Sequence, residues 1–458
     1  MIPAIEQGDG PRYRQIYEFY KSAILGQQLL SETKLPSYRW LAKQIGVSNN
    51  TVLQAYDQLT AEGYLRNEPR KGLYVNKIEI KKWQLPRPVT AQKPRAATRK
   101  MPFSASVHLV DQVNFPIRQW RKSANIALDN ISYQYEEHES NDTLKEELVK
   151  YLYKFRGVNA NHEQLVIGSG TSTLLFWLAF VLRKRCSKLL FENPGYTRVR
   201  NLFEEFGYQI SPLSVTTNGV DLQRLKKLKA DLLYLTPSHQ YPTGVALPVS
   251  HRLQILEWAK RTSAFIIEDD FDCEYRYKTK LMPSLQALDA SGNVIYIGTF
   301  SSALMPSLRV AYMVLPQPLL ESTMPFRYLT NTVSYVTRKT LGLFMEGGHW
   351  ESHLRKMNKI YRLKYEVCIQ ALRKLPADKL HYNNNPSGLN IFLRLYTPQT
   401  ESEIVKRAAE QGILVTPAGQ FYMDKKRRKH PEILFEFGSL PQSEIEGIIN
   451  KLYKAWFL

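Results

Sequence analysis

Apolar residues near the start of the chain recur at the spacing of one helical face. Ile16, Tyr20 and Ile24 lie four positions apart, and this spacing predicts an amphipathic helix within residues 13–30 that ends near Gly26. The remaining residues of this segment are mostly polar. The pattern therefore indicates a helix that buries one side and exposes the other.

Two further short amphipathic helices are predicted within residues 35–62. Their apolar positions fall on one face of each helix: Leu41, Ala42 and Ile45 in the first, and Val52, Ala55, Tyr56 and Leu59 in the second. Gly46 and Val47 separate them, and Ser48 stands where a side chain caps the second helix. Two helices joined by so tight a turn pack at a steep angle, which leaves the second helix's N-terminus free to enter a major groove.

From about residue 108 onward, short apolar runs alternate with longer helical patterns. The runs include "QLVIGSG", "KLLFE", "DLLYLTP", "AFIIEDD" and "VIYIGTF", and "TSTLLFWLAFVLRK" reads as a helix directly after the first. This alternation predicts an α/β domain with a mainly parallel sheet covered by helices. Such sheets bind ligands at the carboxyl ends of their strands, where the polar clusters of this sequence fall.

Length and charge divide the chain further. A chain of 458 residues is longer than a single core usually supports. The formal net charge of +20 favours polyanionic partners, and basic residues with interspersed prolines are concentrated between Lys77 and Lys100. We expect an N-terminal domain over residues 1–76, an extended basic linker over 77–107 and a large domain over 108–458. The linker is either a solvated tether or a contact to DNA phosphates.

No apolar run approaches the roughly 18 residues of a membrane span, and the N-terminus lacks the apolar stretch of a signal peptide. These features predict a cytoplasmic protein with no membrane partner. Cys186, Cys273 and Cys368 are far apart in the sequence, which argues against a disulfide framework and a zinc site.

The segment from Leu35 to Leu65 resembles the winged helix-turn-helix of the GntR regulators. The resemblance rests on Leu-Pro-Ser-x-Arg-x-Leu-Ala from Leu35, Gly-Val-Ser from Gly46 and Glu-Gly-Tyr-Leu from Glu62. It implies binding to a double-stranded DNA operator through Arg39, Ser48, Asn49, Asn50 and Thr51, and through a wing around Arg70, Lys71 and Gly72. Asn49 departs from the family pattern, because many relatives carry arginine there. Loss of that cation should weaken binding or change the preferred operator.

The segment "GSGTST" at residues 168–173 follows a strand and opens a helix, as a phosphate site would. Taken alone, it is better explained by a plain strand-to-helix turn. Together with "ENPGYTRVR", "LTPSHQYPTG", "IIEDDFDCEYRY" and "YIGTFSSALMPSLR", it resembles the fold-type I aminotransferase domain of MocR-type regulators, a GntR subgroup. The resemblance implies a site for pyridoxal 5′-phosphate. Its phosphate would be held by Ser169, Gly170, Thr171, Ser172 and Arg309, its ring by Tyr196 and its pyridinium nitrogen by Asp269.

Three positions depart from that pattern. Relatives read Gly-Thr-Phe-Ser-Lys, whereas this chain has Ser302 in place of the Schiff-base lysine, and serine cannot form an imine. Phe271 stands where relatives place a tyrosine, and Leu434 aligns with an arginine that clamps an amino-acid carboxylate. The nearest lysines, Lys278 and Lys280, are not expected to reach the pocket.

These losses predict a transcriptional regulator that is a homodimer and not an enzyme. The large domain would bind pyridoxal 5′-phosphate noncovalently, or another anionic metabolite, or no ligand at all as a dimerising scaffold. Among these possibilities, we rank sensing of an unidentified small molecule first. The alternative is a pyridoxal-phosphate-dependent aminotransferase with an accessory DNA-binding domain. No catalytic residue and no metal site is predicted.

Overall fold

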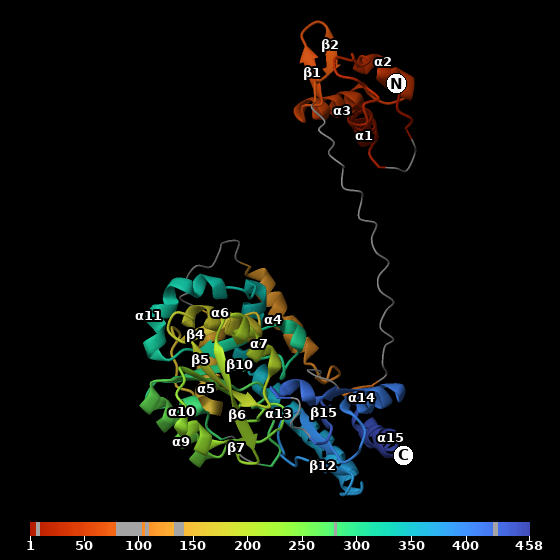
Figure 1. Ribbon diagram of the computed structural model, residues 1–458. Coiled ribbons are helices and arrows are strands. Elements are labelled where there is room, and N and C mark those ends of the chain that lie inside the picture. Colours follow the sequence, from red (N-terminus) through yellow and green to blue (C-terminus); the bar gives the residue numbers. More distant parts are fainter. Residues whose placement is uncertain (6–9, 79–102, 106–109, 132–141, 279–281, 425–428) are drawn as a thin grey trace. The chain divides into compact units, whose positions relative to one another are not determined.

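The chain divides into two compact units, Met1–Thr98 and Arg99–Leu458. The structure is a computed structural model that describes residues 1–5, 10–78, 103–105, 110–131, 142–278, 282–424 and 429–458 (Figure 1). Most of the predicted basic linker, residues 79–102 and 106–107, lies outside the described residues, as does Lys280.

The described residues of the first unit form three helices and a two-stranded antiparallel sheet, in the order expected for a winged helix-turn-helix. The elements are α1 (Arg12–Leu25), α2 (Tyr38–Ile45), α3 (Asn49–Ala61), β1 (Leu65–Glu68) and β2 (Gly72–Val75). The predicted helices are confirmed. Their apolar faces meet in one core that includes Ile16, Leu41, Val52 and Leu59.

The turn between α2 and α3 follows from its sequence. Gly46 has a φ of 67°, a left-handed conformation that glycine adopts without strain, and it ends α2. The Ser48 hydroxyl accepts a hydrogen bond from the Thr51 backbone N–H at 3.2 Å. The predicted cap is therefore confirmed, and it fixes the start of α3.

The second unit is built on an eight-stranded sheet with the order β4-β11-β10-β9-β8-β5-β6-β7. Its strands are β4 (Leu165–Gly168), β5 (Lys188–Asn193), β6 (Gln209–Thr216), β7 (Gly219–Val220), β8 (Leu232–Leu235), β9 (Phe265–Asp269), β10 (Val294–Thr299) and β11 (Ala311–Val314). Strands β10, β9, β8, β5 and β6 run parallel to their neighbours in that series. The predicted mainly parallel sheet is confirmed.

Helices cover both faces of this sheet, so its strands are apolar on both sides. Tyr234 of β8 packs in a cluster with residues of α6 (Thr171–Leu182), whereas Leu233 and Leu235 pack in a cluster with α9 (Val249–Thr262). The other helices of the unit are α4 (Ile117–Asp129), α5 (Thr143–Arg156), α7 (Thr197–Glu205), α8 (Leu222–Lys227), α10 (Leu285–Leu288), α11 (Leu320–Thr323), α12 (Tyr335–Glu346), α13 (His349–Arg373), α14 (Glu401–Glu410) and α15 (Ile445–Phe457). Burial on both faces explains the nearly continuous apolar runs of the sequence.

A second sheet, of five strands, packs with α14 and α15 (Figure 1), and all of its strands except β3 follow the long helix α13 in the chain. Its strands, in spatial order, are β12 (Leu380–Tyr382), β13 (Asn390–Leu395), β15 (Glu432–Glu436), β14 (Ile413–Pro417) and β3 (Phe103–Ala105). The sequence assigned β3 to the linker, whereas the structure pairs it in parallel with β14. A three-residue edge strand has no periodicity that a sequence pattern could reveal.

Two sequence-based exclusions can be compared with the described residues. No helix among them is long and apolar enough to cross a membrane. The three cysteines are all buried and unpaired, in agreement with the prediction of free thiols.

Candidate functional site

A cavity of about 340 Å³ opens at the carboxyl ends of the strands of the eight-stranded sheet. Its volume lies within the range typical of small-molecule sites. The cavity brings together most of the residues predicted for the cofactor, from segments far apart in the sequence: Thr171, Ser172, Tyr196, Asp269 and Arg309. Ser169 and Gly170 lie directly before them in the β4–α6 turn but do not line the cavity.

The β4–α6 turn forms one end of the cavity, and Gly170 fixes its shape. Gly170 has a φ of 99°, and a Cβ added to it would lie 2.4 Å from the Arg309 guanidinium. Arg309 Nη2 in turn donates to the Ser169 carbonyl oxygen at 3.4 Å. Only glycine allows this close approach of the arginine to the turn.

Backbone donors at the same end remain available. The Thr171 and Ser172 N–H groups begin α6, and neither has a hydrogen-bond partner among the described residues. Ser169 differs from the prediction, because its N–H donates to Thr332 Oγ1 and its hydroxyl lies 3.2 Å from that of Thr173. The two free N–H groups, the helix N-terminus and Arg309 form a site suited to a phosphate; Ser169 supports the turn.

Asp269 is the last residue of β9 and lines the cavity. Within the described residues, one of its carboxylate oxygens is hydrogen-bonded and the other is not. Its Oδ2 accepts a 2.5 Å hydrogen bond from the Tyr234 hydroxyl, whereas its Oδ1 is buried without a partner among the described residues. Burial raises the pKa of the carboxyl to about 7. A protonated ring nitrogen would satisfy Oδ1 and favour the ionised carboxylate, so the residues present fit a pyridoxal phosphate ring.

Tyr196 stands at the start of α7 and lines the cavity. Its ring meets that of Tyr241 edge to face, with centroids 5.5 Å apart. Burial raises the pKa of the Tyr196 hydroxyl, so it is neutral near pH 7.

The position of the covalent anchor holds no amine. Ser302 follows β10 and lines the cavity, and no lysine lines it within the part of the chain that the structure describes. Lys278 is exposed and does not line the cavity. Phe271 also lines it, whereas Leu434 is fully buried in a neighbouring apolar cluster with Tyr241 and Phe421.

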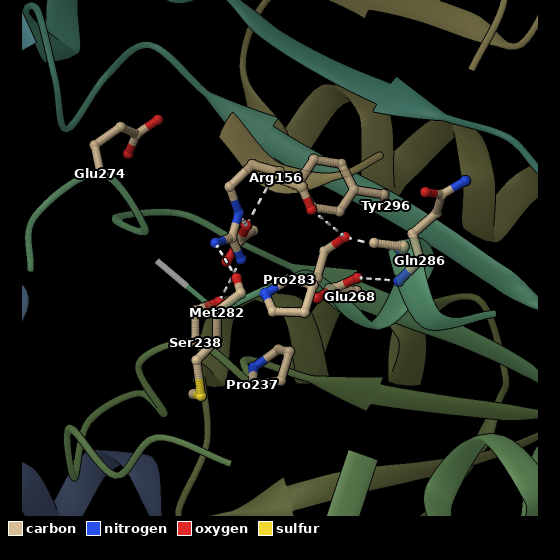
Figure 2. Close-up of polar contacts among 12 residues, drawn as sticks. Arg156, Pro237, Ser238, Glu268, Glu274, Met282, Pro283, Gln286 and Tyr296 are labelled. Carbon is tan, nitrogen blue, oxygen red and sulfur yellow. Dashed lines mark hydrogen bonds and ion pairs between the residues drawn. The ribbon is translucent and has the colours of Figure 1, made fainter. Parts of the chain in front are cut away.

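A buried ion pair holds the segment that carries these residues. Arg156 Nε lies 2.8 Å from Asp270 Oδ2, and its other nitrogens donate to Ser238 Oγ and the Met282 carbonyl oxygen. Figure 2 shows the guanidinium reaching Ser238 and Met282 beside Tyr296, whose hydroxyl also donates to Asp270. The network fixes the chain directly after Asp269.

A second carboxylate, that of Glu268, also holds strand β9 in place. Both oxygens of Glu268 accept backbone hydrogen bonds at the start of α10, from Leu285 and Gln286 (Figure 2). Glu268 and Asp270 flank Asp269, so the orientation of the cavity carboxylate is set by bonds on each side of it.

In the first unit, the predicted DNA-binding residues form an exposed polar set. Arg39, Ser48, Asn49, Asn50, Arg70, Lys71 and Gly72 are exposed, and Thr51 is half-buried beneath the Ser48 cap. Arg39 donates from Nε to the Tyr38 hydroxyl at 3.2 Å. Lys71 lies 3.5 Å from Glu68, across the wing turn in which Arg70 has a φ of 66°.

The lining residues that the sequence interpretation missed include Arg198, Tyr241, Asn390 and Glu436. The first two lie within motifs already singled out, two positions after Tyr196 and within "SHQYP". Glu436 gave a separate signal, because it is a charge within the otherwise apolar run "ILFEF". Asn390 gave no such signal in the sequence, because only the pairing of β13 with β15 brings it to the cavity.

Comparison with known proteins agrees with this architecture. The model described as "Bacterial regulatory proteins, gntR family" matches residues 12–75, and "Aminotransferase class I and II" matches residues 98–432. The HTH-type transcriptional regulator YdeL of Bacillus subtilis is 36% identical over 98% of this chain and 97% of its own. The probable rhizopine catabolism regulatory protein MocR of Rhizobium meliloti is 31% identical over 100% of this chain and 96% of its own.

Solved structures show the fold of the second unit. The kynurenine aminotransferase of Pyrococcus horikoshii superposes with a TM-score of 0.70 at 23% identity, over 78% of this chain and 91% of its own. That likeness concerns the fold alone. With relatives matched along their whole length, the chain belongs to the MocR-type HTH transcriptional regulators, in which a GntR DNA-binding domain precedes an aminotransferase class I and II domain.

Proposed function

We propose that this chain binds a specific DNA operator as a homodimer and that its aminotransferase-like domain senses a small molecule without catalysing transamination. The observation that carries the proposal is the contrast within one cavity. A phosphate site and a ring-nitrogen partner, Asp269, stand beside Ser302, where covalent capture requires an amine. A cavity with this residue set is suited to holding a ligand but lacks the group that would process it.

Pyridoxal 5′-phosphate, if it is the ligand, supplies an aldehyde that condenses with amines and a ring that withdraws electrons. This chain's residues would hold its phosphate at Thr171, Ser172 and Arg309, its ring against Tyr196 and its nitrogen at Asp269. Ser302 has no amine to anchor the aldehyde or to move a proton at the adjacent carbon. Binding would therefore be noncovalent and turnover very small.

The first unit supports the DNA-binding part of the proposal. Its exposed set includes the cations Arg39, which lies on α2, and Arg70 and Lys71, which lie on the wing. Cations and free helix-terminal polar groups are what phosphate and base contacts use. A homodimer would present two such units to an operator with repeated half-sites.

Hydride trapping followed by mass spectrometry tests the missing amine. The full chain, incubated with pyridoxal 5′-phosphate and reduced with borohydride, should carry no pyridoxyl group in the cavity, although thermal unfolding should show a raised melting temperature. The matched variant Ser302→Lys should acquire one pyridoxyl group at position 302. A trapped group on a cavity peptide of the unaltered chain would favour the alternative, an aminotransferase with an accessory DNA-binding domain.

A mobility shift tests gene regulation separately. The full chain should bind the region upstream of its own gene in preference to random DNA, with an affinity that falls steeply with salt. Pyridoxal 5′-phosphate or another effector should change that affinity. Equal binding to both DNAs would contradict a specific operator, and a ligand that binds without changing operator affinity would leave only the scaffold role.

A further inference from the structure

The outward face of α3 carries no positive charge. Helical spacing places Asn50, Leu53, Gln54 and Asp57 on one side of this helix, and all four are exposed. The opposite side is buried in the core of the first unit. The whole helix, Asn49–Ala61, contains no arginine, lysine or histidine. Its outward face therefore consists of amides, one leucine and one carboxylate.

The two amides at the centre of this face make no side-chain hydrogen bond within the described residues. These are the amides of Asn50 and Gln54. The two residues are four positions apart, so their side chains lie on one line, separated by about 6 Å along the helix axis. Successive bases of a DNA strand are about 3.4 Å apart along the duplex axis. Asn50 and Gln54 can therefore contact base pairs that lie within two steps of each other.

Leu53 lies beside the two amides and is 39% exposed. It belongs neither to the hydrophobic core of the first unit nor to the partly buried apolar residues that pack against that core. A single exposed leucine is ordinary on a protein surface. On a helix that enters a major groove, however, its methyl groups match the apolar group displayed there, the C5-methyl of thymine.

The side chains of this face differ from those that proteins use for guanine. In the major groove guanine presents two acceptors, and its commonest specific partners are arginine and lysine. Adenine presents an acceptor beside a donor, which match the amide of asparagine or glutamine, and thymine adds its methyl group. The outward face of α3 therefore offers partners for adenine and thymine and no cation for guanine.

The exposed cations predicted to contact DNA lie outside α3. Arg39 is on α2, and Arg70 and Lys71 are on the wing. In the proposed function these cations contact phosphates, which position the protein but do not read the sequence directly. Asp57 is two turns from the start of α3, whereas helix-turn-helix proteins contact base edges with the N-terminal residues of this helix. The base contacts are therefore assigned to the two amides and Leu53.

We propose that α3 reads A·T base pairs, with Asn50 and Gln54 each bonded to an adenine and Leu53 in contact with a thymine methyl group. This inference rests on the proposed binding to a specific operator, and it specifies the base pairs that α3 contacts in each half-site. Guanine is disfavoured at these positions, because α3 has no cation to donate to its two acceptors.

Selection from a pool of randomised DNA duplexes by the full chain identifies the half-site, and the enriched sequences should contain a block of A·T pairs. Asn50→Ala and Gln54→Ala should each lose the preference for adenine at one position, and Leu53→Ala should lose a preference for thymine. Gln58→Ala is the matched control. That amide is exposed on the same helix but donates to Glu62 Oε1 at 3.1 Å, so its loss should change no base preference.

Small changes in the selected duplex test the contacts directly. 7-Deazaadenine lacks the N7 acceptor and deoxyuridine lacks the thymine methyl group, and both keep the Watson–Crick pair. At the assigned positions, 7-deazaadenine should weaken binding by the parent chain about fivefold or more, and deoxyuridine about threefold, in fluorescence anisotropy titrations. The matching alanine variant should bind the altered and unaltered duplexes equally, because it has already lost that contact.

The outcomes separate this inference from the function on which it rests. If selection enriches no sequence, both the specific operator and the A·T readout are overturned. A preference for guanine or cytosine that disappears in Asn50→Ala, Gln54→Ala or Asp57→Asn overturns the A·T readout and leaves specific binding in place. Base preferences that all three alanine variants keep, or undiminished binding to the altered duplexes, have the same consequence.

Discussion

The polar residues of the DNA-binding unit and those of the cavity are held in opposite ways. Arg39, Asn49 and Asn50 are exposed, and within the described residues Arg39 hydrogen-bonds its neighbouring tyrosine and no distant segment. In the cavity unit, Arg156 and Asp270 are buried and each makes several bonds to distant segments. The first set is exposed and can contact a binding partner, whereas the second set makes hydrogen bonds and ion pairs within the fold.

This difference indicates where each unit can change. An exposed side chain that stabilises nothing in the folded chain can be replaced at little cost, so operator preference can change at Asn49 without loss of structure. A cavity residue can be replaced only if its buried partners stay satisfied. Ser302 meets that condition, because a half-buried serine in a turn leaves no buried charge behind.

Removing Arg156 should have the largest effect on stability. Arg156→Met leaves the buried Asp270 carboxylate without its cation and should lower the free energy of unfolding by about 3–5 kcal/mol. Lys154→Met is the matched control two residues earlier, where the side chain is 63% exposed and pairs with Glu351 on the surface. That change should cost no more than about 1 kcal/mol.

Urea unfolding followed by tryptophan fluorescence measures both variants. Equal losses in the two would mean that the Arg156 network does not stabilise the cavity unit as its burial indicates. The DNA-binding unit should be unaffected in either case, and a mobility shift with operator DNA checks this.

The second largest effect should be a pH dependence of the free energy of unfolding that arises from the Asp269 carboxyl. Burial raises its pKa from 3.8 to about 7 in the folded chain. Between those values the folded state keeps a proton that the unfolded state releases, so this group's contribution to stability falls as pH rises from about 4 to 7. Asp269→Asn should remove that contribution. Relative to the parent chain, the free energy of unfolding of the variant should be greater at pH 8 than at pH 4 by up to roughly 4 kcal/mol, at 1.36 kcal/mol per pKa unit.

Asp231 provides a control of opposite sign. Burial alone would raise its pKa, but hydrogen bonds from the Ser187 and Lys188 backbone N–H groups outweigh it and lower the pKa. Asp231→Asn should therefore lose stability at neutral pH, and the loss should vanish as pH falls through the lowered pKa. Thermal melts from about pH 2 to pH 8 measure both, with the Asp231 effect expected below about pH 4 and the Asp269 effect above it. Matching slopes in the two variants would contradict the burial of Asp269.

Much of the fold could be predicted from the sequence because local patterns determine it. Helical spacing gave α1 and α3, and apolar runs bounded by polar turns gave β8 and β9. The absence of a lysine at position 302 was readable directly, since it is a residue identity in a recognised motif.

The rest of the site depends on contacts between distant segments. Arg156 meets Asp270 across 114 residues and Ser238 across 82, and no local pattern signals either bond. Asn390 reaches the cavity only through the register of β13 against β15. The edge strand β3 was assigned to the linker for the same reason, because its pairing with β14 is long-range.

Gly170→Ala should separate ligand binding from folding. A Cβ there would meet the Arg309 guanidinium, in a conformation with positive φ that alanine rarely adopts. The affinity for pyridoxine 5′-phosphate should fall about 10- to 100-fold, on the order of 1.4–2.7 kcal/mol. In Gly447→Ala, the control, the new Cβ meets nothing within 4 Å, in the helix α15, and ligand affinity should not change. Titration calorimetry measures both, and equal affinities would mean that the β4–α6 turn does not hold the phosphate.

Arg39→Ala should have the smallest energetic effect and should appear only in DNA binding. The side chain is exposed and has no acidic partner in the described unit, so folding stability should stay within about 0.5 kcal/mol of the parent. If Arg39 neutralises one phosphate, operator affinity falls about tenfold and the slope of log affinity against log salt decreases by about 1. Arg39→Lys keeps the charge and should keep most of the slope, whereas Lys229→Ala, on the other unit, should change neither quantity. An unchanged slope in Arg39→Ala would mean that this arginine reads a base or contacts nothing, and the exposed set would then owe its affinity to the wing cations.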